Sequence, residues 1–366
     1  MLFCGALNFD KRSVSFCELR KMYGPRRGGT AFINREIGII CDGEAQPLTV
    51  SYNGSLYTAA ISTCSPVARS GGDAAQAVLQ GYFEEGEAYV RRMDFPFALA
   101  LYDSRCGELL LSKGAMGDRA LFYTQRDGTL YFASSIKPLI RLLGGCLRIN
   151  KAVLQRHLCG EYGALPEGLF CDLTPIRPDN SLLCSCFGHA RVPTVGSVAP
   201  SAVERRDGEY SELFRGDVDV RRALNEALYA FDYPQFDCYM PYLNALLSEA
   251  HGAGKRELLV CDPMTDICER YAVERTDRLA QLWKLSVRTC ACENSKLPSR
   301  YLKRMEREID AILDEYMSDE GCIIGALDGE CREHILNEKS TPLRIRKKGM
   351  LAQSAMWSEI FNIILV

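Results

Sequence analysis

The sequence predicts an α+β protein built from two domains, and three observations support this class. The first ~190 residues alternate short strand-like runs with turn signals, whereas the rest of the chain shows mainly helical periodicity. With 366 residues, the chain is long enough for two hydrophobic cores. Residues 191–208 are rich in Pro, Ser, Gly and Val without a clear period, and are expected to form a linker between the halves.

Short turns divide the amino-terminal half into strand-like segments. Asn53-Gly54 separates two such segments and is a strong signal for a two-residue hairpin turn. Residues 97–102 are apolar almost throughout, which is typical of a strand buried on both faces. Strands are expected at residues 38–41, 48–52, 55–61, 97–102, 120–123 and 130–133.

Helical periodicity is clearest at residues 73–83 in the amino-terminal half, where Asp73 is a good N-cap. The basic run at residues 344–348 is expected to be a solvated surface segment before a last helix. The apolar run at residues 357–366 is expected to pack against the second domain. Further helices are expected at residues 218–230, 242–251, 276–287 and 300–316.

Composition and charge exclude several classes of function. The formal net charge is −3 and the pI is about 6.0, which gives no electrostatic basis for binding nucleic acid or an anionic membrane. The sequence contains no run of about 18 apolar residues, so no membrane-spanning helix is predicted. The first residues lack the basic and apolar pattern of a secretion signal, so a cytoplasmic location is expected.

Seventeen cysteines are spread from Cys4 to Cys331 without a regular framework. Their odd number and the length of the chain are unlike a disulfide-stapled domain, so most are expected to be reduced, buried, small apolar residues. The close pairs at residues 184–186 and 290–292 lack the C-x-x-C spacing of structural zinc sites. No metal site is therefore predicted.

Several strings in the amino-terminal half match one known family in residue type, order and spacing. They are Cys4-Gly5, Ala45-Gln46-Pro47-Leu48, Tyr52-Asn53-Gly54-Ser55-Leu56-Tyr57, Tyr82-Phe83-Glu84-Glu85-Gly86-Glu87, Phe95 to Asp103 and Leu130 to Leu139. Together they resemble the amino-terminal half of glutamine-hydrolysing asparagine synthetases, which are class II glutamine amidotransferases. The resemblance covers about half of the chain.

The resemblance implies a fold and a division of the chain. Residues 1–190 are expected to form an N-terminal-nucleophile domain, a four-layer αββα sandwich with two antiparallel sheets between helical layers. Residues 209–366 are expected to form a smaller, mostly helical domain that is a reduced relative of the synthetase domain. The chain would then be a degenerate and truncated member of the family.

The resemblance also implies catalytic roles. In this family the cysteine becomes the first residue, its thiol attacks the glutamine side chain, and its free α-amine is the base. Cys4 would be that nucleophile, while the Asn53 side-chain amide and the Gly54 N–H would form the oxyanion hole. Each assignment has a structural alternative: Cys4 as a buried strand cysteine, and Asn53-Gly54 as a hairpin turn only.

Two further residues would bind the amino-acid end of the substrate. Asp73, in Ser70-Gly71-Gly72-Asp73, stands where the family binds the α-ammonium group, although it could serve only as a helix cap. Arg35 stands where an arginine of the family binds the α-carboxylate. The family's H-x-R-L context is replaced by Asn34-Arg35-Glu36-Ile37, which favours a surface arginine.

Several departures from the family argue against catalysis. The α-amine of Cys4 is part of the Phe3–Cys4 peptide bond, and Leu2 is too large for efficient removal of Met1 by methionine aminopeptidases. A cut between Phe3 and Cys4 would restore the free amine. Residues 112–123 also lack an arginine, an aspartate and a proline of the family's R-D-x-x-G-x-x-P-L-Y-Y string.

The second half lacks the loop with which asparagine synthetases bind the pyrophosphate of ATP. Its expected position reads Cys238-Tyr239-Met240-Pro241-Tyr242-Leu243-Asn244-Ala245, without the glycines or the acid–hydroxyl pair of an S-G-G-x-D-S loop. No G-x-x-x-x-G-K-[ST] loop occurs either. No cofactor is predicted, although the family uses ATP and Mg²⁺.

Two functions are consistent with this pattern. The first is an asparagine-synthetase-like pseudoenzyme without ATP-dependent amide synthesis or glutaminase activity, which acts as a binding or scaffold protein. The alternative is an active glutaminase, processed to begin at Cys4, that hydrolyses glutamine to glutamate and ammonia for a partner synthetase in asparagine or amide biosynthesis. The expected partners are glutamine and a synthetase or pathway protein, and neither nucleic acid nor a membrane is expected.

Overall fold

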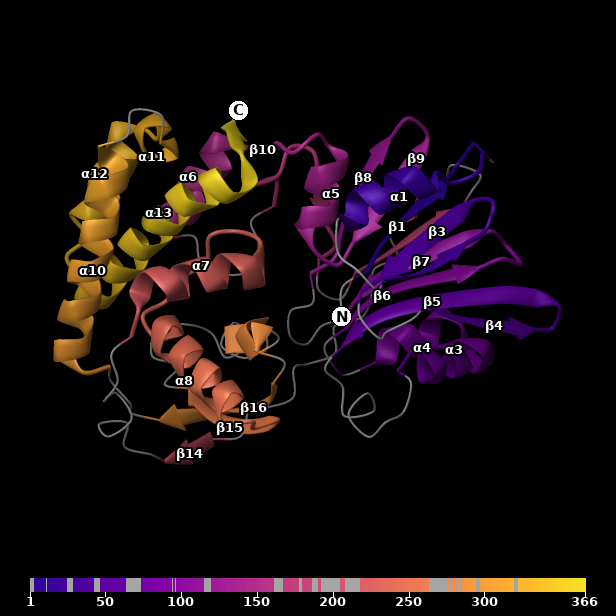
Figure 1. The fold of residues 1–366 in the computed structure, drawn as a ribbon, viewed down its shortest axis with the longest axis horizontal. Helices are drawn as coiled ribbons and strands as arrows, with labels where there is room; N and C mark the ends of the chain where they lie inside the picture. The colour runs from indigo at the N-terminus through magenta and orange to yellow at the C-terminus, as the bar shows by residue number, and fades with distance from the viewer. Residues whose placement is uncertain are drawn as a thin grey trace. The chain divides into compact units, whose positions relative to one another are not determined.

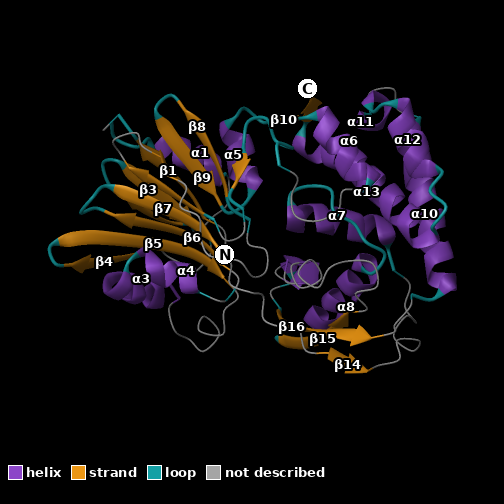
Figure 2. Cartoon of the chain, turned by 180° about the vertical axis from the view of Figure 1, so that it is seen from behind, coloured by secondary structure: helices purple, strands orange, loops and turns teal. Residues whose placement is uncertain are grey.

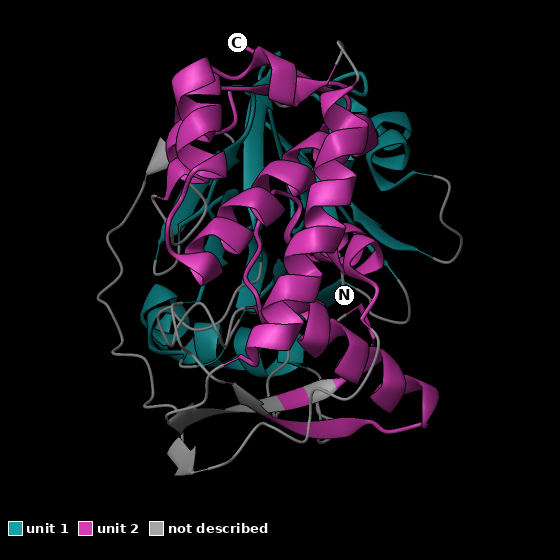
Figure 3. Cartoon of the chain, turned by 90° about the vertical axis from the view of Figure 1, so that its left-hand side faces the viewer, with its two compact units in different colours: residues 1–145, 172–200 teal, residues 146–171, 201–366 magenta. Residues whose placement is uncertain are grey.

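The described chain of this computed structural model forms two compact units (Figures 1 and 3). Unit 1 comprises residues 1–145 and 172–200, and unit 2 comprises residues 146–171 and 201–366. The structure describes residues 3–10, 12–24, 29–42, 47–63, 74–93, 95, 97–114, 120–160, 167–177, 180–185, 190–191, 205–207, 218–262, 275–276, 278–280, 282–283, 285–293, 297–318 and 322–366.

The units divide the chain differently from the predicted domains at 1–190 and 209–366. Residues 146–171 belong to unit 2, because β10 (Leu147–Ile149) pairs in parallel with β17 (Ile363–Leu365). Most of the predicted linker at 191–208 lies outside the described residues. Near its two ends the chain forms the short strands β13 (Ala190–Arg191) and β14 (Arg205–Asp207).

Two six-stranded antiparallel sheets form the centre of unit 1 (Figure 2). The first, sheet A, has the order β11 (Thr174–Pro175), β8 (Phe122–Arg126), β9 (Thr129–Ala133), β1 (Phe3–Asn8), β3 (Ile37–Cys41) and β2 (Thr30–Ile33). The second, sheet B, has the order β13, β12 (Ser181–Ser185), β7 (Glu108–Lys113), β6 (Phe97–Asp103), β5 (Ser55–Thr63) and β4 (Leu48–Tyr52).

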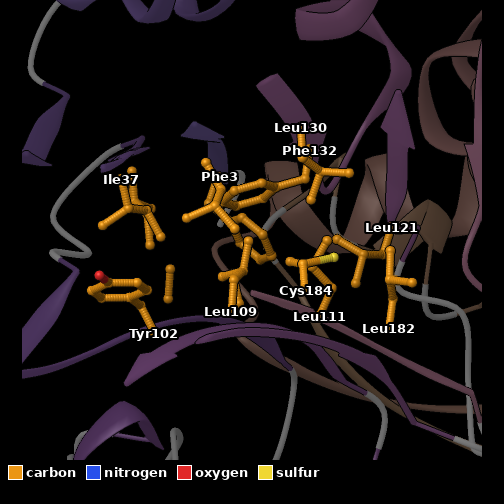
Figure 4. Close-up of a cluster of buried hydrophobic side chains, with 14 of the residues drawn as sticks. Phe3, Ile37, Tyr102, Leu109, Leu111, Leu121, Leu130, Phe132, Leu182 and Cys184 are labelled. Atoms are coloured by element: carbon orange, nitrogen blue, oxygen red, sulfur yellow. The ribbon is translucent and has the colours of Figure 1, made fainter. Parts of the chain in front are cut away.

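An apolar core joins the two sheets. Phe3, Leu7 and Phe132 of sheet A pack with Ala98 and Leu111 of sheet B (Figure 4). Every residue of β6 is buried, as its apolar run predicts. Burial of this apolar surface on the facing sides of both sheets is what holds a sandwich together.

Helices cover the outer face of each sheet. Sheet A is covered by α1 (Phe16–Tyr23) and α5 (Ile136–Leu142), and sheet B by α3 (Ala74–Glu85) and α4 (Glu87–Arg92). Ser15 and Ser135 accept hydrogen bonds from backbone N–H groups at the starts of α1 and α5, which fixes where these helices begin. The predicted four-layer αββα sandwich is therefore confirmed.

Unit 2 combines helices with a small parallel sheet. The sheet has the order β14, β16 (Ser286–Glu293) and β15 (Glu257–Asp262). The helix expected at 276–287 ends before β16 begins at Ser286. The helices are α6 (Lys151–Cys159), α7 (Val220–Phe231), α8 (Met240–Gly252), α10 (Ser299–Met317), α11 (Ile323–Ala326), α12 (Gly329–Leu336) and α13 (Thr341–Phe361).

The expectation that residues 344–348 form a solvated segment before the last helix is wrong. They lie inside α13, and Lys347 is only 3% exposed. Partners distant in sequence neutralise these charges: Arg344 pairs with Glu306 at 2.6 Å, and the Lys347 Nζ lies 2.8 Å from a carboxylate oxygen of Glu338. A paired charge can be buried at much lower cost than an isolated one.

Candidate functional site

Cys4 lies in β1, an inner strand of sheet A. β1 pairs antiparallel with β3 on one side and with β9 on the other, so that Cys4 stands opposite Ile40 and Ala133. All six residues of β1 are buried. A strand covered on both faces favours apolar and small side chains, which the sequence from Cys4 to Leu7 supplies.

The Cys4 side chain points toward the helical layer and away from the core between the sheets. Side chains alternate along a strand, and Phe3 and Leu7 belong to the core between the sheets (Figure 4). A Cβ on Gly5 would collide with the Phe132 ring of that same core. Cys4 therefore faces the layer formed by α1 and α5.

Burial keeps the Cys4 thiol protonated. Cys4 is 1% exposed, and loss of solvation raises its pKa to about 12, an effect that the charge of Arg141 opposes and that of Asp42 reinforces. Arg141 donates hydrogen bonds from Nη1 to the carbonyl oxygens of Met22 at 3.1 Å and Tyr23 at 3.2 Å, at the end of α1. The guanidinium is thus engaged by α1, and Cys4 is a neutral thiol near pH 7.

Phe3, the residue before Cys4, is an integral part of β1. It is 2% exposed and pairs with Cys41 in the ladder. Its N–H donates to the Ser134 Oγ at 2.9 Å, and its carbonyl oxygen accepts a hydrogen bond from the Ser134 N–H at 2.9 Å. Its ring meets the Phe132 ring edge-on, with the ring centres 6.4 Å apart. Both backbone pairing and core packing therefore hold the residue that acylates the Cys4 nitrogen.

Asn53 and Gly54 form the turn between β4 and β5. Their φ angles are 48° and 80°, and a two-residue type I′ hairpin requires positive φ at both positions. Both residues are exposed. β5 has nine residues and is about 30 Å long. Figures 1 and 2 show this turn at one end of the sandwich and β1 beginning at the opposite end, so the structure does not bring the turn to Cys4.

Arg35 lies in the short connection between β2 and β3, exposed, with its N–H donating to the Asn34 Oδ1 at 2.6 Å. Cys4 stands opposite Ile40, five residues further along the chain, which corresponds to about 17 Å of strand. The structure therefore separates Arg35 from Cys4. Asp73 lies outside the described residues.

Polar residues that the sequence reasoning did not select lie at the end of the sandwich where β1 begins. Asp42, Lys113 and Ser134 stand at or just past the ends of β3, β7 and β9. Ser62, near the end of β5, is in register with Ala98, which is in turn in register with Lys113. In the sequence, each of these residues could have been recognised as a polar residue at the end of an apolar run. Most strand ends show the same pattern, so it does not single out these positions.

The carboxylate of Asp237 binds the start of α8. This is the segment where the family's pyrophosphate loop is expected and where the sequence lacks it. The Asp237 Oδ1 accepts hydrogen bonds from the N–H groups of Tyr239 at 2.9 Å and Met240 at 3.1 Å. The fully buried Arg275 places its Nη1 2.6 Å from the same oxygen, and its guanidinium carbon lies 5.0 Å from the centre of the Tyr239 ring. These two backbone amides, the type of group that binds phosphate at helix starts, are already bonded within unit 2.

The described part of the chain has neither a metal-binding cluster nor a membrane-spanning helix. No three His, Cys, Asp or Glu side chains gather there as a group that could hold a metal ion. None of the helices described is both long and apolar enough to cross a membrane.

Sequence comparisons place this domain among known proteins. Residues 42–189 match the family model of the glutamine amidotransferase domain. Proteins of Mycobacterium bovis and Mycobacterium tuberculosis that carry the name asparagine synthetase (glutamine-hydrolyzing) are 29% identical over 126 residues. The match covers 34% of this chain and only 18% of each relative's length.

Two solved structures align at low similarity with 82% of the chain. One is a glutamine phosphoribosylpyrophosphate amidotransferase from B. subtilis complexed with ADP and GMP, with 9% identity, a TM-score of 0.34 and 64% of that chain covered. The other is described as the allosteric regulatory enzyme of purine biosynthesis, with 10% identity, a TM-score of 0.34 and 63% covered. The sequence matches, and not these structural alignments, show the glutamine amidotransferase domain.

Proposed function

The chain carries a glutamine amidotransferase domain of the asparagine-synthetase type, and from this premise we propose that it is a non-catalytic homologue that acts as a binding or scaffold protein. In this proposal it neither hydrolyses glutamine nor makes amides with ATP. Its partner would be a synthetase or another protein of amide biosynthesis, to which it offers the amidotransferase scaffold without the chemistry.

The burial of Phe3 is the observation that carries the proposal. The family's mechanism needs a cysteine whose own α-amine is free to accept the proton of the thiol. Here Phe3 acylates that nitrogen, fills the core between the sheets and exchanges hydrogen bonds with Ser134. A peptide nitrogen has no basic lone pair, so Cys4 lacks the base that the mechanism requires.

The environment of the Cys4 thiol supports the same conclusion. A pKa of about 12 leaves very little thiolate at neutral pH, whereas reactive cysteines have a lowered pKa. The side chain lies under the helices of sheet A, and Asn53, Gly54 and Arg35 lie elsewhere on the unit. Without a thiolate, a free α-amine or the oxyanion donors predicted from the family, Cys4 lacks the groups that the family's attack on a carboxamide uses.

The contacts at the start of α8 support the proposed absence of ATP-dependent synthesis. Asp237 bonds the amides at this helix start, and the fully buried Arg275 pairs with Asp237. A phosphate there would have to displace a buried, paired carboxylate, and breaking such a pair is costly.

Glutamine hydrolysis by the full-length protein tests the proposal. Glutamate and ammonia are measured for the wild type and for Cys4→Ala, and we expect equal, background-level release from both. Ammonia release that is lost in Cys4→Ala would contradict the proposal and support a glutaminase.

A variant that begins at Cys4 separates two explanations of an inactive protein. If the blocked amine were the only defect, removing residues 1–3 would create a glutaminase. We expect the variant to remain inactive and to be less stable, because it loses the Phe3 ring from the core. Cys4-dependent hydrolysis by this variant, or a chain from the native host that begins at Cys4, would favour the processed glutaminase instead.

A further inference from the structure

Two cysteines on different helices of unit 2 lie in contact. Cys159 is the last residue of α6, and Cys331 lies in the first turn of α12. Their Sγ atoms are 3.3 Å apart, although 172 residues separate them along the chain. Both are free thiols, Cys331 buried and Cys159 partly exposed.

Polar contacts beside the sulfurs hold α6 and α12 in place. The Gln155 Nε2 donates to the Asp328 Oδ2 at 2.9 Å, and the Asp328 N–H donates to the Gln155 Oε1 at 3.1 Å. The Lys151 Nζ lies 2.6 Å from the Asp328 Oδ1. Lys151, Gln155 and Cys159 follow each other at intervals of four residues and so share one face of α6. The two thiols stand at the end of this interface.

We propose that Cys159 and Cys331 form a reversible disulfide when the protein meets a peroxide, which makes the pair a site of oxidative modification that fastens α6 to α12. The inference is independent of the proposed function. A disulfide has an S–S distance near 2.05 Å, so the sulfurs must approach by roughly 1.2 Å. Cys159 is the last residue of its helix, where such a displacement disturbs little of the helix.

The chemistry balances with a peroxide as the only oxidant. The Cys159 thiolate attacks a peroxide oxygen, the O–O bond breaks, and Cys159 becomes a sulfenic acid as the first water leaves. The Cys331 sulfur then attacks the Cys159 sulfur, the S–O bond breaks, and a second water leaves. The two thiols lose two electrons and two protons, and hydrogen peroxide gains them.

Exposure decides the order of these steps. Burial and the neighbouring Cys159 raise the pKa of Cys331 to about 12, so Cys331 is a poor first target for peroxide. Cys159 is more exposed and is therefore the first of the two thiols to be oxidised. Once Cys159 is oxidised, the contact between the sulfurs offsets the small thiolate fraction of Cys331, because the second step is intramolecular.

Peptide mapping without reductant tests the proposal. The full-length protein is treated with hydrogen peroxide, and we expect a linked pair of peptides containing Cys159 and Cys331, lighter by two hydrogen atoms and separated by reductant. Cys159→Ser and Cys331→Ser should each abolish the link. Cys171→Ser is the matched control, because Cys171 is exposed and lies in the same unit. It should leave the link unchanged.

The melting temperature gives a second readout. A cross-link that closes so long a loop restricts the unfolded chain, so oxidation should raise the melting temperature of the wild type and reductant should reverse the rise. Peroxide that converts Cys159 to sulfinic acid without a link would overturn the proposal, as would links distributed among many cysteines. A complete link without a rise in melting temperature would overturn its stabilising role.

Discussion

Cys4 and Cys331 are both buried thiols whose pKa is raised to about 12, but they lie in opposite kinds of surroundings. Cys4 belongs to an inner strand, with hydrogen-bonded neighbours on both sides and Phe3 fixed in the core before it. Cys331 lies in the first turn of a helix with another sulfur 3.3 Å away. In our proposal the first setting prevents reaction, whereas the second provides a partner sulfur.

Burial alone does not decide what a thiol can do. Reaction requires an approach path and a nearby group that completes the chemistry, either a base or a second sulfur. In unit 1, Cys4 has no free α-amine as a base, because Phe3 acylates its nitrogen, whereas in unit 2 the contact of Cys159 with Cys331 provides a second sulfur.

The largest effect is expected from Phe3→Ala. Loss of a fully buried aromatic ring should lower the free energy of unfolding by about 3–5 kcal/mol, measured by urea denaturation. Phe16→Ala is the control, because Phe16 is 52% exposed and should change stability by less than about 0.5 kcal/mol. A small effect of Phe3→Ala would mean that Phe3 does not hold Cys4 in the sheet.

Cys4→Ser should cost more than the same change at Cys159. A hydroxyl in the buried place of the Cys4 thiol should destabilise by about 1–3 kcal/mol, since it is more polar than the thiol it replaces. Cys159 is only partly buried, so Cys159→Ser under reducing conditions should change stability by less than about 1 kcal/mol. Equal losses in urea denaturation would remove the contrast between the two sites.

Stability should fall at alkaline pH. Burial raises the pKa of Cys4 to about 12, whereas an unfolded thiol titrates near 9.0. The folded state therefore holds the proton more tightly than the unfolded state does. The stability that the raised pKa provides is complete below pH 9 and is lost as the pH rises toward 12. Each thiol with such a shift should lower the free energy of unfolding by about 1.4 kcal/mol by pH 10. Cys4→Ala should lose stability less steeply over this range, and an unchanged pH dependence would contradict the burial of the thiol.

The smallest effect is expected from Asp328→Asn. It removes the exposed ion pair with Lys151 while keeping most of the polar shape, so the melting temperature should hardly change. The rate of peroxide-dependent linking of Cys159 to Cys331 should fall by less than about five-fold. Complete loss of the link would show that the ion pair, and not the sulfur contact, brings the thiols together.

Much of unit 1 could be predicted because its signals are local. The apolar run of β6 and the Asn53-Gly54 turn mark a buried strand and a hairpin without reference to the rest of the chain. In unit 2, the parallel sheet includes β14, a strand of only three residues that lies within the predicted linker and has no periodicity to recognise. The burial of Lys347 depends on Glu338, and sequence patterns do not show which charges will pair.

The candidate site could be predicted only in part, for a geometric reason. The matching strings correctly indicated the amidotransferase fold, but a string does not tell at which end of a strand it will lie. Asn53-Gly54 directly precedes β5 and therefore lies at the end of the sandwich opposite the start of β1. The role of Phe3 was equally hidden, because its contacts come from Ser134 and Phe132, far along the chain.

Chemical labelling of Cys4 in the native protein tests whether its thiol can react with a glutamine-like substrate. The full-length protein is treated with an electrophilic glutamine analogue at pH 7.5, digested and mapped by mass spectrometry. A parallel sample is treated with a general alkylating agent, for which the exposed Cys17 is the internal reference thiol. We expect that Cys4 stays unmodified by either reagent in the folded protein and reacts with the alkylating agent only after denaturation. Stoichiometric labelling of Cys4 by the analogue in the folded protein would contradict it.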